Sequence, residues 1–497
     1  MTRSRFVAVL VMTAAVAAAS AACSRPTPEQ QIVNDAATAL GGRDRVLAVT
    51  TLVLEGEGTQ YNLGQDIVPG ASGQTFTVSQ YTRTIDVPGG RARTELTRTP
   101  NFQFFQGPAP QTQINGLAGD VAYNVAANGT ATRAGGTALA DRRLEILHHP
   151  VTAVRAALTE GASLTNLRTE GGQSLVDVNL AGQAFTLAID ATTKLPSRVV
   201  HKADNVNLGD VMISTTFGGY QAVGDLQLPT QLTVKTDDFT TADYRITSQN
   251  TAEVGGGTAA ADLAAPPAAV AAPAPAGPPP VMATSEVLAP GIWLIGGGSH
   301  HSVLVEFADH LMLIEAPQNE ARTLAAIAKA RETVPGKPLT QLVNTHHHFD
   351  HSGGVRAAVA EGLTVITHGG NRVFFEEIAS RPHTIVPDAL QKNPKPIAFD
   401  NVSGEKTVTD GRMTVNLYPV TGAHSATMLM AYFPRERILV EVDVYTPGAA
   451  AQTFAGQFLT DVQARKLRVD RIVPLHGMPA PFAQLAKDVT AAAVATN

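Results

Sequence analysis

The stretch that most restricts the fold is Thr345–Gly354, which reads THHHFDHSGG. Four histidines and one aspartate fall within six positions, directly after the largely apolar run Leu339–Val343. Such a run predicts a short buried strand, so the polar cluster lies where a strand opens into a loop. Imidazole nitrogens and carboxylate oxygens are the ligands that hold Zn²⁺ or a similar divalent ion. A solvated histidine-rich loop is the simpler interpretation, but HxHxDH between a strand and Gly-Gly favours a metal site.

The spacing within this loop divides the ligands into two groups. His346 and His348 alternate and can turn toward one ion, whereas Asp350 and His351 can turn toward a second. One loop cannot complete two coordination spheres, so the other ligands must come from later in the chain. The only cysteine is Cys23, which excludes an intrachain disulfide and a cysteine zinc site. Eleven of the 14 histidines follow residue 290, which places the predicted chemistry in the C-terminal half.

Three later residues stand at the ends of predicted strands and can supply the missing ligands. His424 lies in VTGAHSATM, Asp443 ends ILVEVD, and His476 ends RIVPLHG. Each of them alone is more often a structural residue. Their occurrence together and in this order, downstream of HxHxDH, favours a joint site.

With these residues in place, residues 286–480 resemble the metallo-β-lactamase superfamily, whose pattern is HxHxDH followed by a His, an Asp and a final His. The resemblance implies an αβ/βα sandwich that binds two metal ions. It implies a first ion bound by His346, His348 and His424, a second bound by Asp350, His351 and His476, and Asp443 as the bridging ligand. It gives no ligand role to the variable positions His347 and Phe349. Glu315 stands where much of the family has Asp, and it is expected to orient a ligand histidine.

Two neighbouring divalent ions lower the pKa of a shared water toward neutrality, so hydroxide becomes available at ordinary pH. Asp350 is expected to orient this hydroxide and to carry a proton to the leaving group. The expected activity is hydrolysis of a small ester, lactone, thiolester, lactam, or sulfate or phosphate ester. Zn²⁺ is the default ion, with Fe or Mn as alternatives. Asp443 argues against the best-known β-lactamase subclass, which has Cys at this place.

A different class of function is also open: a periplasmic lipid- or ligand-binding lipoprotein whose hydrolase domain is catalytically idle. A degraded site should have lost a ligand, and all seven positions are present. Net charge is −6, with acids and bases mixed along the chain. A nucleic-acid partner, which would require a basic stripe, is therefore not expected.

Residues 1–23 have the features of an export signal. Two arginines precede the apolar run Phe6–Ala19, and three small residues precede Cys23. A transmembrane anchor is the alternative, but the run is short for a span of roughly 20 residues. The segment resembles a bacterial lipoprotein signal, which implies a lipidated Cys23; simple cleavage after Ala22 remains open. Either way the protein is expected in the periplasm or at the outer membrane, and Ser24 favours the outer membrane.

The chain of 497 residues is too long for one ordinary domain. Residues 28–251 combine Thr-, Val- and Ile-rich alternating segments with turn residues, which predicts an antiparallel β-domain with a few helices. FTLAIDATTKLPSRVV and GDLQLPTQL resemble the half-barrel sheets of periplasmic lipoprotein-carrier proteins, which implies a lipid or acyl ligand. No catalytic constellation is evident here, and His148, His149 and His201 are expected to be packed or surface residues.

Residues 252–283 are Ala, Pro and Gly with almost no charge, which predicts an extended linker. Residues 284–497 alternate strands and helices and form the expected hydrolase domain, so the predicted fold class is α+β. The Pro-rich segment 380–400, with His383, is expected to cover the site. His300 and His301, in GGGSHHS, either border the pocket or occupy a plain turn.

Overall fold

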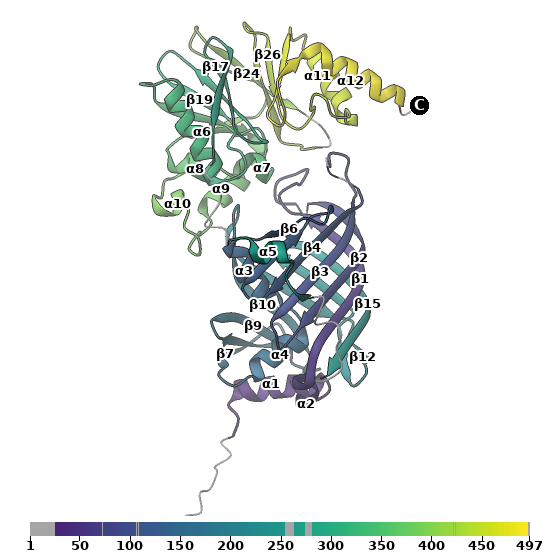
Figure 1. The fold of residues 1–497 in the computed structure, drawn as a ribbon. Helices are drawn as coiled ribbons and strands as arrows, with labels where there is room; N and C mark the ends of the chain where they lie inside the picture. The colour runs from purple at the N-terminus through teal and green to yellow at the C-terminus, as the bar shows by residue number, and fades with distance from the viewer. Residues whose placement is uncertain are drawn as a thin grey trace, which may run out of the picture.

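The computed structural model describes residues 25–495 except 72, 106, 108, 254–262, 274–280, 421 and 423. The predicted export signal and Cys23 lie outside the described residues. Figure 1 shows a large curved sheet from the N-terminal half beside an α/β sandwich from the C-terminal half. Within the described residues, no helix has the length and apolar character needed to cross a membrane.

The N-terminal half is dominated by one antiparallel sheet with the strand order β6-β5-β4-β3-β2-β1-β15-β14-β11-β10-β9-β8-β7. The first and the last long strands, β1 and β15, pair at its centre. The strands are β1 Val49–Asn62, β2 Gln74–Asp86, β3 Arg91–Pro100, β4 Gln111–Ala118, β5 Val121–Val125, β6 Ala131–Arg133, β7 Ser163–Glu170, β8 Gln173–Leu180, β9 Gln183–Asp190, β10 Pro196–Asn205, β11 Gly209–Gly218, β14 Gln231–Thr236 and β15 Phe239–Glu253. A separate hairpin pairs β12 Gln221–Val223 with β13 Leu226–Leu228.

The sheet is curved, and helices pack against it and contribute to its apolar core. The helices are α1 Pro28–Ala39, α2 Arg43–Ala48, α3 Gly136–Glu145 and α4 Pro150–Leu158. Helix α3 contacts β4 and β5 as well as β9 and β10, which lie far apart in the strand order. Helix α4 is buried along most of its length, and His149 caps its N-terminus by accepting a hydrogen bond from the backbone N–H of Val151.

The segment expected to be an extended linker contains a packed helix. Helix α5, Pro267–Ala271, lies against β5 and β6 and buries Ala269 completely. Leu263 is also fully buried, and Arg133 donates a hydrogen bond to the carbonyl of Ala272 at 3.2 Å. The linker prediction was therefore wrong for these residues, because short apolar side chains can pack against an existing sheet even where they cannot form a core of their own.

The C-terminal half consists of two sheets packed face to face. The first has the order β16-β17-β18-β19-β20-β21-β22 and changes from antiparallel to parallel pairing at β19. Its strands are β16 Thr284–Ala289, β17 Ile292–Gly296, β18 Ser302–Glu306, β19 Leu311–Ile314, β20 Leu339–Val343, β21 Thr364–His368 and β22 Ala398–Val402. The second contains β23 Lys406–Thr409, β24 Thr414–Val420, β25 Met428–Phe433, β26 Ile438–Glu441, β27 Arg471–Pro474 and β28 Ala480–Pro481, in that order.

Helices cover the outer faces of both sheets. The outer face of the first sheet is covered by α6 Glu320–Thr333, α8 Val355–Ala360, α9 Arg372–Ser380 and α10 Ala389–Lys392, and the second by α11 Thr453–Ala464 and α12 Phe482–Ala495. The short helix α7, Phe349–Ser352, and a 3₁₀ turn, Gly369–Asn371, complete the order. Apolar residues of both sheets form one core between them. The predicted α+β fold, with a β-rich N-terminal part and an αβ/βα sandwich, is confirmed.

Candidate metal centre

The predicted ligands gather at one edge of the sandwich, where its strands end. His346 and His348 follow β20, His424 follows β24, Asp443 follows β26, and His476 follows β27. Asp443 has a positive φ of 56°, a left-handed conformation that non-glycine residues rarely adopt. Such backbone persists only where the surrounding structure holds it, and it turns this side chain into the cluster.

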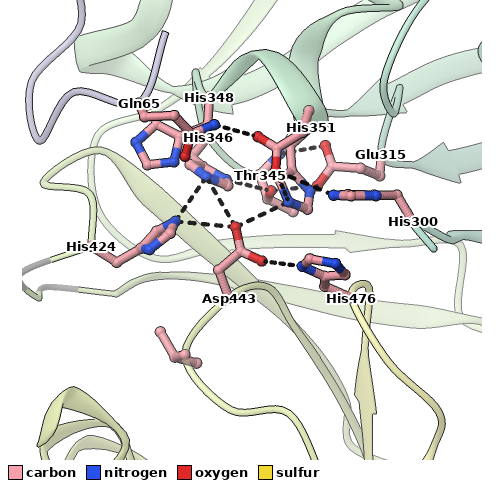
Figure 2. A network of polar contacts seen from close by, with 12 residues as sticks. Gln65, His300, Glu315, Thr345, His346, His348, His351, His424, Asp443 and His476 are labelled. Atoms are coloured by element: carbon pink, nitrogen blue, oxygen red, sulfur yellow. Dashed lines mark hydrogen bonds and ion pairs between the residues drawn. The ribbon is translucent and has the colours of Figure 1, made fainter. Parts of the chain in front are cut away.

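Two groups of donor atoms meet at this edge, and Figure 2 shows their arrangement. Ligand atoms of His346, His348, His424 and Asp443 lie within 4.8 Å of one another. The same limit holds for Asp350, His351 and Asp443.

Asp443 joins the two groups. Its Oδ2 lies 3.1 Å from His424 Nε2 and 3.0 Å from His351 Nε2. Its Oδ2 is also 3.6 Å from His346 Nε2, and its Oδ1 is 3.4 Å from His476 Nδ1. One carboxylate therefore faces histidines of both predicted coordination spheres, which is the position that a bridging ligand requires.

His300 is an additional donor at this edge. Its Nε2 donates a hydrogen bond to Asp350 Oδ2 at 3.2 Å, and its ring stacks on that of His476 with centroids 4.1 Å apart. His300, His351 and His476 form a further group of donor atoms within 4.8 Å. His300, in the GGGSHHS turn, therefore contacts two of the predicted ligands that line the cavity, Asp350 and His476, without lining it itself. His301 instead hydrogen-bonds through its backbone N–H to the carbonyl of Leu475.

Glu315 supports the ligand loop from behind, as the sequence predicts. It is fully buried, with a φ of 85°, and its Oε2 lies 3.4 Å from His351 Nδ1. Its carboxylate accepts hydrogen bonds from Asn344 Nδ2 at 2.8 Å and from the Thr345 hydroxyl at 2.5 Å. These contacts fix the ring of His351 and the start of the loop.

The N-terminal half also reaches this site, through the turn after β1. Gln65, seen beside His348 in Figure 2, donates through Nε2 to Asp350 Oδ1 at 2.7 Å. The carbonyl of Asp66 accepts from His348 Nε2 at 2.8 Å. The backbone N–H of Phe349 donates to the carbonyl of Gly64 at 3.1 Å. Because the Asp66 carbonyl occupies Nε2, the nitrogen of His348 that remains for a metal is Nδ1, which is buried and has no hydrogen-bond partner.

The charge distribution of the site suits a bound cation. Burial, together with the neighbouring histidines, keeps the pKa of His346 and His348 well below the ordinary value, so both rings are neutral and can donate a lone pair. Burial also lowers the pKa of His351, but Asp443 and Asp350 outweigh this and raise it well above the ordinary value. The negative charge of the two carboxylates beside this ring is one that a bound divalent ion would neutralise. The donor set fits such ions by type, spacing and charge.

A cavity of about 170 Å³ opens over these groups. Four predicted ligands line one side, namely Asp350, His424, Asp443 and His476. The other side comes from the N-terminal half: Asn62, Gln65, Phe102, Phe104 and Phe105. The ring of Phe104 packs against His424 with centroids 4.4 Å apart.

The prediction that the Pro-rich segment 380–400 covers the site was wrong. None of its residues lines this cavity, although the whole segment is described. The segment instead packs on the turn between β10 and β11. The carbonyl of Pro382 accepts from the Asp210 N–H at 2.8 Å, and Asp210 Oδ1 accepts from the backbone N–H groups of Thr384 and Ile385. His383 is buried at this contact.

The remaining predicted residues lie outside the donor groups. His347 is buried, with its ring edge-on to Phe374, and Phe349 packs between the two halves. In the N-terminal half His148 and His201 are buried and hydrogen-bonded to each other at 2.6 Å, which fits their predicted packing role.

Comparison with known proteins gives the same picture for the C-terminal half. Residues 295–440 match the family model of the metallo-beta-lactamase superfamily. The match includes the histidine loop and His424, whereas Asp443 and His476 follow it.

Similar solved structures include a metallo-beta-lactamase from Hirschia baltica, at 18% identity, covering 42% of this chain and 97% of that chain with a TM-score of 0.33. The FIM-1 metallo-beta-lactamase of Pseudomonas aeruginosa in its mono-zinc form is 20% identical and covers 44% of this chain and 98% of that chain with a TM-score of 0.34. The sec-alkylsulfatase Pisa1 of a Pseudomonas species is 18% identical and covers 42% of both chains with a TM-score of 0.33. The family match, the paired sheets and the His/Asp cluster agree: residues 295–440 match the metallo-beta-lactamase superfamily, which indicates a metal-dependent hydrolase.

Proposed function

We propose that this protein binds two divalent metal ions, with zinc as the default, and hydrolyses a small ester, lactone, thiolester, lactam, or sulfate or phosphate ester. The observation that carries this proposal is the position of Asp443, whose two carboxylate oxygens lie 3.0–3.6 Å from His346, His351, His424 and His476. His346, His348 and His424 would hold one ion, Asp350, His351 and His476 the other, and Asp443 both.

Divalent ions at such a site lower the pKa of water and polarise the oxygen of the bond under attack. The chain's own residues supply the rest. Burial raises the pKa of the Asp350 carboxyl, but His351 and His300 outweigh this and hold it below its usual range, so the group is ionised. Asp350 faces the cavity and would accept a proton from the attacking water and pass it to the leaving group. Gln65 and His300 each hold one of its oxygens and fix its direction.

The test is a substrate panel on the zinc-loaded full chain, with one lactone, one thiolester, one sulfate ester and one β-lactam. His346→Ala should abolish hydrolysis, because it removes a fully buried ligand. His310→Ala is the matched control, since His310 lies before β19, at the end of that strand opposite to Glu315. Hydrolysis retained in His346→Ala would refute the site assignment. Protein that binds no metal and hydrolyses nothing would favour the alternative, a ligand-binding lipoprotein with an idle hydrolase domain.

We also propose that the protein is exported and carries a lipid on Cys23, which would place it in the periplasm or at the outer membrane. The support is the sequence of residues 1–23, with its arginines, its apolar run and its small residues before the cysteine. Cell fractionation and labelling with an alkyne fatty acid test this. Wild-type protein should be labelled in the membrane fraction and Cys23→Ser should not, whereas unlabelled soluble wild-type protein would indicate simple cleavage. The lipid or acyl ligand of the N-terminal sheet stays a prediction.

A further inference from the structure

The connection between β3 and β4 carries an aromatic cluster. Phe102, Phe104 and Phe105 fall within four positions, and all three are half-buried. Phe76, which is 1% exposed, supports two of these rings: it lies edge-on to Phe102 at 5.1 Å and to Phe105 at 5.6 Å. The Arg98 guanidinium lies over the other side of Phe76, 3.9 Å from its ring centroid. The loop is therefore supported on the sheet and presents apolar surface outward.

These three rings line the cavity beside the metal centre and form what we term the phenylalanine wall (Phe102, Phe104 and Phe105). The opposite side consists of Asp350, His424, Asp443 and His476. A molecule bound between the two would place a polar, reactive group on the metal side and an apolar group on the wall. Half-buried aromatic rings that line a cavity beside convergent polar groups are the usual composition of a small-molecule site.

The residues that line the cavity also restrict the charge and the size of the apolar group of the substrate. Among its described lining residues there is no lysine or arginine, so a second anionic group on the substrate would have no cationic partner. A cavity of about 150 Å³ lined by apolar side chains accommodates a ring the size of benzene. The volume here, about 170 Å³, must hold the reacting group as well, so the uncharged apolar group is limited to about six carbon atoms at most.

We propose that the phenylalanine wall is the specificity pocket of the hydrolase, and that the substrate is an ester-type molecule with an uncharged apolar group of up to about six carbons beside the scissile bond. This inference rests on the proposed function and deepens it. It assigns the N-terminal sheet a role in catalysis: the sheet completes the active site that the C-terminal half begins.

Two measurements on the zinc-loaded full chain test the proposal. The first is hydrolysis of ethyl acetate and ethyl hexanoate followed by pH-stat, which needs no aromatic leaving group. We expect kcat/KM for the hexanoate to exceed that for the acetate by about tenfold or more, the usual gain from added methylenes in an apolar pocket. The second is calorimetric titration with methylphosphonate and hexylphosphonate, which are not hydrolysed, so binding is read without turnover.

The variants are Phe105→Ala, Phe105→Leu and, as matched control, Phe399→Ala. Phe399 is also half-buried but lies on the edge strand β22, away from the cavity. Phe105→Ala should reduce two ratios to about threefold or less: kcat/KM for the hexanoate over the acetate, and the affinity for hexylphosphonate over methylphosphonate. Phe105→Leu, which keeps the loop apolar, should give intermediate ratios. Phe399→Ala should keep the wild-type ratio.

The outcomes separate the two proposals. If neither ester nor any member of the substrate panel is hydrolysed, the proposed function fails while the pocket is still judged by phosphonate binding. Equal binding of both phosphonates by the wild-type protein would overturn the pocket proposal. A wild-type ratio in a folded Phe105→Ala variant would overturn it as well.

Discussion

Gln65 connects the two halves of the chain at the residue expected to handle protons. Its Nε2 donates a hydrogen bond of 2.7 Å to Asp350 Oδ1, across 285 positions of sequence. We predict that Gln65→Leu, which removes the donor at similar volume, lowers kcat and leaves the metal bound. A hydrogen bond to a charged group contributes about 1.5–3 kcal/mol, which corresponds to about 10- to 150-fold in rate. Because His300 still holds the other oxygen of Asp350, we expect the lower end, about tenfold.

The assay is steady-state kinetics together with the metal content of the same samples. A loss in kcat at unchanged metal content identifies a positioning role for Gln65, whereas lost metal would identify a role in metal binding. Gln60→Leu is the matched control, since Gln60 lies near the end of β1, the strand before the Gln65 turn, and donates to the Tyr244 hydroxyl at 2.9 Å. A kcat within about threefold of wild type in Gln65→Leu would refute the reasoning.

Three further predictions follow from single side chains. Glu315→Ala should weaken metal affinity by about 10- to 100-fold in a chelator competition, because it removes the support of the ligand loop; unchanged affinity would contradict this. Gly64→Ala should destabilise the fold by about 1–3 kcal/mol in thermal unfolding, since a Cβ there would lie 2.0 Å from a ring carbon of Phe349; Gly70→Ala, with a similar φ and open space, is its control. Burial lowers the pKa of His149 to about 3, so below pH 6.5 the unfolded chain takes up a proton that the native protein does not. This histidine should therefore account for about 2 kcal/mol of the stability lost between pH 6.5 and pH 5 in urea titrations, and His149→Gln should reduce the loss by that amount.

The ligand loop could be predicted from the sequence because its signal is local. HxHxDH lies within six positions, and the strand before it is a continuous apolar run. His424, Asp443 and His476 each end a strand of a recognisable pattern, and strands of one sheet bring their ends to one edge. The alternating strands and helices of the C-terminal half predict the sandwich for the same reason.

The contribution of the N-terminal half could not be predicted. Gln65 and the Asp66 carbonyl reach the site across more than 280 positions, and a glutamine in a turn carries no signal of its own. The three phenylalanines between β3 and β4 are a visible cluster, but their sequence does not say which surface they face. The segment 380–400 has the composition of a lid, yet Asp210 supplies a carboxylate that holds it elsewhere.

Some elements have weak local preferences and depend on their neighbours. Strand β4 reads QTQINGLA, whose Gln, Asn and Gly residues are poor strand formers, and it is stabilised by pairing with β3 and β5. Helix α5 lies in a run of Ala and Pro that has no charge pattern or apolar periodicity, so its packing depends on the neighbouring sheet.

The central claim is that Asp443 joins two metal sites. The direct measurement is metal content by mass spectrometry after zinc loading and gel filtration, for the wild-type protein and for Asp443→Asn. We predict two zinc ions per wild-type chain and at most one in the variant. A wild-type chain that holds fewer than two ions, or an Asp443→Asn chain that still holds two, would contradict the account.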